Sequence, residues 1–103
     1  MNLYEEYSLV QKQINQFKDN KIPVPKALYQ RQYNTVKQIN DTFEKQQRED
    51  ISDYALGIRY NMMLKYFAEK LNLPVEEYKQ KIRNFNFKLT GENLTDEEML
   101  IKD

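Results

Sequence analysis

The residues whose chemistry best suits recognition lie in a short stretch that combines aromatic rings with cations. They are Tyr29, Arg31, Tyr33 and Lys37. Tyrosine and arginine contribute strongly to the energy of protein–protein interfaces, and tyrosine rings also stack on single-stranded nucleic acid. We therefore predict that these residues bind a partner, with a protein as the first candidate. The alternative interpretation places Tyr29 and Tyr33 on the core side of a helix, behind a solvated basic face.

A second group of cations belongs to a pattern over residues 66–83 that resembles a helix-turn-helix. Ala68 would be the small residue at the helix crossing, and Asn72 would take the left-handed position of the turn. Leu73 and Tyr78 would be apolar contacts between the two helices. Basic residues are expected on or beside the exposed face of the second helix, where they could bind nucleic acid: Lys79, Lys81, Arg83 and Lys88.

Acids at the start of this second helix weigh against DNA binding. Glu76 and Glu77 lie in its first turn, the end that normally approaches phosphates and base edges, and carboxylates there repel them. Many helical proteins also contain two helices and a tight turn without contacting DNA. A DNA-binding regulator that uses residues 66–83 is therefore the alternative to a protein-binding function.

Side chains suited to catalysis or metal binding are scarce. The chain has no His and no Cys, which excludes the usual nucleophilic triads and the commonest metal ligands. Its two glycines cannot form a P-loop or a dinucleotide fingerprint. The acids near the C-terminus lack the spacing of an EF-hand. We expect a protein without enzymatic activity, cofactor or bound metal.

The elements that would position these residues begin with a helix over residues 3–19. Apolar side chains recur there at spacings of four, three, four and three: Leu3, Tyr7, Val10, Ile14 and Phe17. Asn20 is a candidate left-handed cap at its end. This apolar stripe packs inside the domain or, in an alternative interpretation, forms a homodimer.

Two further long helices are predicted. One covers residues 26–48, and the next runs from an N-cap at Ser52 to Leu71. Apolar side chains cover more than one face of this third helix, which favours a central, buried position. Gly57 lies within it, and a close helix crossing would explain a glycine there.

A fourth helix of about ten residues is expected to begin at Pro74. Residues 84–89 alternate between polar and apolar side chains, and we interpret them as an extended segment. An acidic tail over residues 90–103 contains a capping pattern at Thr95 that would begin a short helix. Its segment 96–101 could dock on a partner.

Together these patterns predict an all-α protein, a small bundle of about four helices over residues 1–89 with a short extended or helical acidic tail over residues 90–103. The 103-residue chain is 40% hydrophobic and 31% charged with zero net charge, and it has no cysteine and no long apolar run. We expect a cytoplasmic protein without a membrane segment.

The residue usage, rich in Lys, Asn, Ile and Tyr, is common in AT-rich genomes. It favours a phage or mobile-element protein that binds and modulates a host factor, such as a defence nuclease or a replication protein. A structural or scaffolding homodimer is the remaining alternative.

Overall fold

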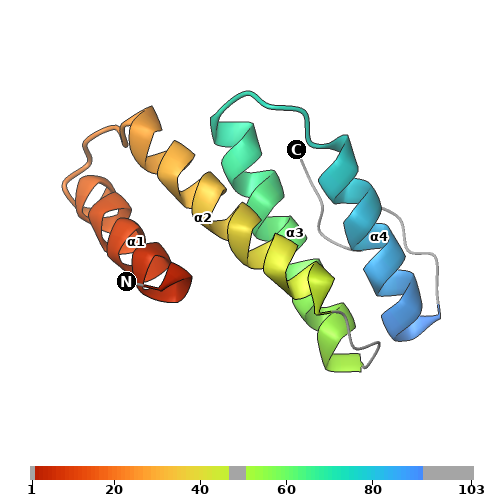
Figure 1. Ribbon diagram of the computed structural model, residues 1–103. Coiled ribbons are helices and arrows are strands. Elements are labelled where there is room, and N and C mark those ends of the chain that lie inside the picture. The colour runs from red at the N-terminus through yellow and green to blue at the C-terminus, as the bar shows by residue number, and fades with distance from the viewer. Residues whose placement is uncertain (1, 47–50, 92–103) are drawn as a thin grey trace.

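The computed structural model describes residues 2–46 and 51–91, and the described residues form α-helices joined by short turns (Figure 1). The helices are α1 (Leu3–Asp19), α2 (Lys26–Lys45), α3 (Ile51–Lys70) and α4 (Glu76–Thr90). No strand occurs within these residues. The predicted all-α bundle of four helices is confirmed, whereas the predicted tail lies almost entirely outside the described residues.

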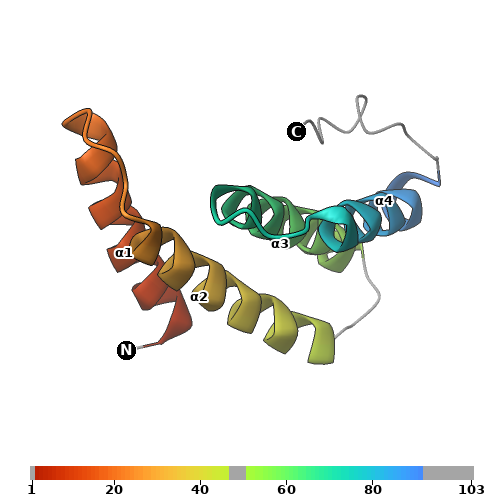
Figure 2. The ribbon, with the colours of Figure 1, turned by 90° about the horizontal axis from the view of Figure 1, so that it is seen from above.

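The helices pack in chain order. α1 packs on α2, α2 on α3, and α3 on α4, and successive helices run in opposite directions (Figure 1). Within the described part of the chain, α1 makes no close backbone contact with α3 or α4. Figure 2 shows α1 diverging from the α3–α4 pair, with α2 between them. One side of the space between α1 and α3 is therefore not covered by a helix of the described chain.

The ends of α1 follow the local sequence, with one correction. The side chain of Asn2 caps the start of the helix by accepting a hydrogen bond of 2.9 Å from the Glu5 amide. The left-handed residue after the helix is Lys21, with φ of 57°, whereas Asn20 has φ of −88°. The side-chain amide of Asn20 instead donates a hydrogen bond of 2.8 Å to the Gln16 carbonyl. The prediction that Asn20 is left-handed was therefore wrong.

The third helix begins slightly earlier than predicted. Because α3 starts at Ile51, Ser52 lies inside its first turn, and the predicted N-cap role for Ser52 is wrong. The end of α2 at Lys45 falls short of the predicted residue 48, and residues 47–48 lie outside the described part. The turn after α3 agrees with the prediction, because Asn72 is left-handed with φ of 57°.

The fourth helix is longer than predicted. It continues through residues 84–89 to Thr90 and ends at Gly91, which is left-handed with φ of 74°. The predicted extended segment is therefore wrong. The alternation arose because Phe85 packs against α3 while Phe87 is a surface residue, 47% exposed. The two rings are two residues apart because Phe85 faces α3 and Phe87 faces solvent on the same helix.

The core has two parts. One lies where α2, α3 and α4 meet and consists of Val36, Leu64, Phe67, Ala68 and Tyr78. The other lies along the α1–α2 contact, where Val10 and Ile14 are almost completely buried. Close packing of α4 on α3, one of the explanations open for Gly57, is what the structure shows, because a Cβ atom there would be 2.7 Å from the Phe85 ring. None of the described helices is long and apolar enough to cross a membrane.

Candidate functional site

The two tyrosines predicted to bind a partner support the packing of the helices. Tyr29 and Tyr33 are half-buried and pack against the core cluster. The ring of Tyr29 lies 6.4 Å from that of Phe67, between centroids. The hydroxyl of Tyr33 forms a hydrogen bond with the hydroxyl of Tyr78, which joins α2 to α4. The interpretation of these tyrosines as core-side residues therefore describes their position.

The two cations of the same group point to different neighbours. Arg31 donates a hydrogen bond of 2.6 Å to the carboxylate of Glu6 and so links α2 to α1. The Lys37 amine lies 5.9 Å from the centroid of the Tyr33 ring. The structure brings Tyr33 and Lys37 together but places Arg31 in a contact with α1. These residues do not share one exposed surface, and their role in partner binding stays a prediction.

The hydrogen-bonded Tyr33–Tyr78 pair predicts a loss of stability at alkaline pH. Burial and the hydrogen bond with Tyr33 raise the pKa of Tyr78 above its ordinary value of 10.0. The protonated phenol therefore stabilises the fold fully below about pH 10, and this contribution is lost as pH rises through the folded-state pKa. We expect the Tyr78→Phe variant to lose about 1 kcal/mol at neutral pH and to show a shallower decline in stability above about pH 10.

Urea unfolding at a series of pH values measures this effect. Tyr29→Phe removes a phenol from the same helix as Tyr33 and leaves the Tyr33–Tyr78 pair intact, so it serves as the control. Parallel curves of unfolding free energy against pH for the wild type and Tyr78→Phe would contradict the assignment.

The helix-turn-helix pattern is realised in part. Ala68 is fully buried, Asn72 is left-handed and Tyr78 is buried, as the pattern predicts. Leu73, by contrast, is 39% exposed and so is not the buried apolar residue that the pattern predicts between the helices. Lys79 is only 7% exposed, so its predicted place on the exposed face is wrong. Tyr78, Lys79 and Ile82 are the buried residues of α4, so Lys79 lies on the inner side of this helix.

The other cations of this pattern contact neighbouring side chains. The Lys81 amine lies 3.0 Å from a Glu44 carboxylate oxygen on α2 and 3.8 Å from one of Glu77. Arg83 donates a hydrogen bond of 3.3 Å to the Gln80 side chain. The Lys88 amine lies 5.7 Å from the centroid of the Tyr54 ring. Each of these cations thus has a neighbouring side chain as its partner, and their role in nucleic-acid binding stays a prediction.

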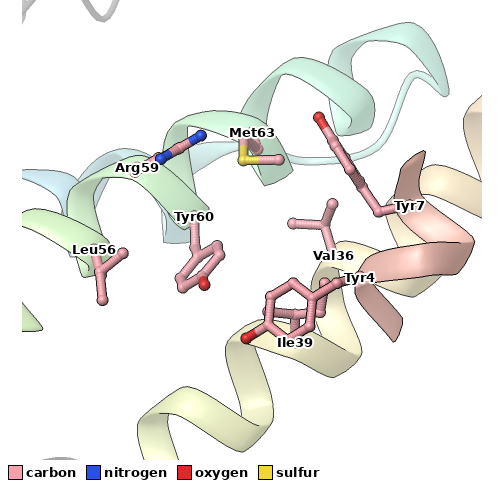
Figure 3. Close-up of a pocket in the computed structure, with 8 residues that line it drawn as sticks. All are labelled: Tyr4, Tyr7, Val36, Ile39, Leu56, Arg59, Tyr60 and Met63. Carbon is pink, nitrogen blue, oxygen red and sulfur yellow. The ribbon is translucent and has the colours of Figure 1, made fainter. Parts of the chain in front are cut away.

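A hollow that sequence reasoning did not predict lies between α1 and α3, over α2. Its first section encloses about 250 Å³. Figure 3 shows side chains of α1 opposite those of α3, with residues of α2 between them. The lining residues are Tyr4, Tyr7, Val36, Ile39, Leu56, Arg59, Tyr60 and Met63.

A second, shallower section lies toward the end of α1 and has a volume of about 380 Å³. Its lining residues are Tyr7, Gln11, Lys18, Met62, Met63, Tyr66 and Phe67. Because Tyr7 and Met63 line both sections, the two sections are adjacent along α3. We call the residues of the two sections together the α1–α3 groove.

The first section of the groove has a cation beside tyrosine hydroxyls. Burial raises the pKa of Tyr7, and the Arg59 guanidinium partly offsets that shift. Burial and a hydrogen bond with Tyr4 raise the pKa of Tyr60, and Arg59 again acts in the opposite direction. Arg59 therefore lies near enough to both phenols for its charge to act on them.

Two lysines lie close to the Tyr66 ring of the second section, and one of them, Lys18, also lines the groove. The Lys18 amine donates a hydrogen bond of 3.2 Å to the Tyr66 hydroxyl, which raises the pKa of Lys18. The Lys18 and Lys70 amines lie 5.7 and 5.4 Å from the centroid of the Tyr66 ring. Lys18 and Arg59 are the only charged residues that line the groove within the described chain.

One signal in the sequence could have indicated the groove. The apolar residues of α3 cover more than one face, and we interpreted that breadth as a sign of a central, buried helix. In the structure, Met62 and Tyr66 on the additional face remain 41% and 38% exposed. The broad apolar surface of α3 therefore supplies both a core face and a wall of the groove.

Comparison with known proteins identified no relative of the chain. No protein-family model, no curated protein and no solved structure matches the chain. Within residues 2–46 and 51–91, no group of three or more acidic side chains is placed to hold a metal ion.

Proposed function

We propose that the chain is a non-enzymatic interaction protein that binds and modulates a protein partner, and that the α1–α3 groove is its binding surface. The observation that carries this proposal is a pair of adjacent, mainly apolar depressions whose walls contain solvent-exposed tyrosine and methionine. The chain is rich in Lys, Asn, Ile and Tyr. On this residue usage we further propose that the protein comes from a phage or mobile element and acts on a host factor.

The composition of the groove fits protein recognition. Tyr4, Met62 and Tyr66 are 64%, 41% and 38% exposed along its walls. Exposed apolar surface that gathers in one depression is typical of interaction sites. Tyrosine and methionine are enriched in protein interfaces, and methionine adapts to irregular partner surfaces because its side chain is unbranched and polarisable.

The DNA-binding alternative has less support. Lys79 is buried, and the side chains of Glu76 and Glu77 are 79% and 73% exposed at the start of α4. That arrangement presents negative rather than positive charge at the end of the helix that would approach phosphates. The following experiment separates the two functions.

Affinity capture from a lysate of the source cells, with and without nuclease, tests the proposal. The wild-type chain is compared with Met62→Glu, which places a charge in the groove. Leu73→Glu is the matched control, because Leu73 is exposed to a similar degree, 39%, but lies in the turn between α3 and α4. Circular dichroism shows whether each variant keeps its helical content.

We expect the wild type and Leu73→Glu to retain a stoichiometric protein after nuclease treatment, and Met62→Glu to lose it. Burying a glutamate against an apolar partner costs several kcal/mol unless the charge is paired. Material that disappears with nuclease would favour the nucleic-acid function. Equal capture by Met62→Glu and the wild type would show that the groove is not the binding surface.

A further inference from the structure

The charges of the α1–α3 groove are of one sign. Arg59 lines the first section and Lys18 lines the second, and the groove-lining side chains among residues 2–46 and 51–91 include no acid. Cations also outnumber acids among the described residues, 14 to 9, so the groove shares the sign of the helical body but is lined by none of its acids. Charge complementarity selects partners and speeds their association. It points to an occupant that carries acids.

The shape of the groove limits what that occupant can be. Val36 and Ile39 lie on α2, between the two walls, and Leu56 and Met63 add further aliphatic surface. Aliphatic side chains suit the apolar stripe of an amphipathic helix, which lies in hydrophobic grooves of this kind.

We infer that the α1–α3 groove binds an acidic amphipathic helix of a protein partner. The carboxylates of that helix meet Arg59 and Lys18 at the two ends of its apolar stripe. This inference rests on the proposed function and adds the chemistry of the partner.

The spacing of the cations sets the pattern of the partner helix. Lys18 is hydrogen-bonded to Tyr66, which follows Arg59 by two helical turns on α3. Seven residues of helix rise by about 10.5 Å. A partner helix that lies along α3 therefore meets both cations when two of its acids are about seven residues apart. Its apolar anchors then lie three and four positions after the first acid, facing the groove.

Fluorescence anisotropy with designed peptides and the full-length chain tests this inference. The first peptide is a helix of about 18 residues, roughly five turns. Two glutamates stand seven positions apart, with leucine and phenylalanine at the anchor positions. A second peptide carries lysines in place of the glutamates. The wild type is compared with the double variant Arg59→Glu/Lys18→Glu. The control is Lys26→Glu/Lys45→Glu, which makes the same change in charge at two exposed lysines of α2 outside the groove.

We expect the wild type and the control to bind the glutamate peptide at least about tenfold more tightly than the lysine peptide. The double variant should reverse this preference. Equal affinity for both peptides would overturn the inference while leaving the groove as a helix-binding surface. If neither peptide binds while capture of a protein still depends on Met62, the inference fails and the proposed function stands.

Two further outcomes would also overturn the inference, because each assigns the groove to another occupant. Residues 96–103 of this chain also carry acids seven positions apart, with apolar residues between them. A peptide of residues 92–103 that binds more tightly than the designed glutamate peptide would assign the groove to the chain itself. Light scattering that shows a dimer disrupted by Met62→Glu would assign it to a second copy.

Discussion

The Gly57→Val variant is expected to lose about 2–3 kcal/mol of unfolding free energy. A Cβ atom at this position would lie 2.7 Å from one carbon of the Phe85 ring and 2.8 Å from two others. It therefore meets the face of the ring, and α4 must shift or the ring must rotate away from α3. Replacing glycine in a helix normally gives a small gain in stability, so a net loss reports the close helix crossing.

Chemical unfolding of Gly57→Val measures this loss, with Ala55→Val as the matched control. Ala55 lies on the exposed side of the same helix, so valine there introduces the cost of a β-branched side chain without the clash. A Phe85→Leu substitution should absorb part of the penalty in a double-mutant cycle. A Gly57→Val variant as stable as the wild type would mean that α3 and α4 do not approach as closely as the structure shows.

The Leu64→Ala variant is expected to lose about 3 kcal/mol. Leu64 is 1% exposed and lies in the core cluster with Val36, Phe67 and Tyr78. Because α2, α3 and α4 all contribute to this cluster, the cavity left by alanine cannot close without moving a helix. The loss should appear as a lower midpoint in urea with an unchanged slope.

Met62→Ala provides the comparison for Leu64→Ala on the same helix. Met62 lines the groove and is 41% exposed, so its truncation should cost less than about 1 kcal/mol. Similar losses for the two variants would contradict the assignment of Met62 to a groove wall and Leu64 to the core. A small stability cost for Met62→Ala would also show that Met62→Glu, at the same position, is a suitable test of binding.

Several features of the fold could be predicted because they depend on local chemistry. The periodicity of residues 3–19 gives the first helix, since an apolar stripe must face a neighbour. Asn72 was identified as the left-handed turn residue because asparagine tolerates that conformation. A close crossing was one explanation for Gly57, since a glycine inside a helix costs stability unless packing requires it, and the Phe85 ring supplies that packing.

Other features depend on contacts between distant segments. Residues 84–89 are helical because Phe85 packs on Gly57, a contact that local alternation does not reveal. The burial of Lys79 follows from the register in which α4 meets α3. The α1–α3 groove was not predicted because periodicity shows which faces are apolar and does not show which of them a neighbouring helix covers.

The packing of helices in chain order has a consequence for how the molecule opens. Among the helices of the described residues, α1 has close backbone contact with α2 alone, whereas α3 contacts both α2 and α4. Local unfolding draws on the least connected parts of a structure, so α1 is expected to detach as a unit while the cluster around Leu64 remains folded. A ligand that spans α1 and α3 would join the first helix to the rest of the protein. Binding would then make opening more cooperative, and part of the binding energy would appear as protection of α1.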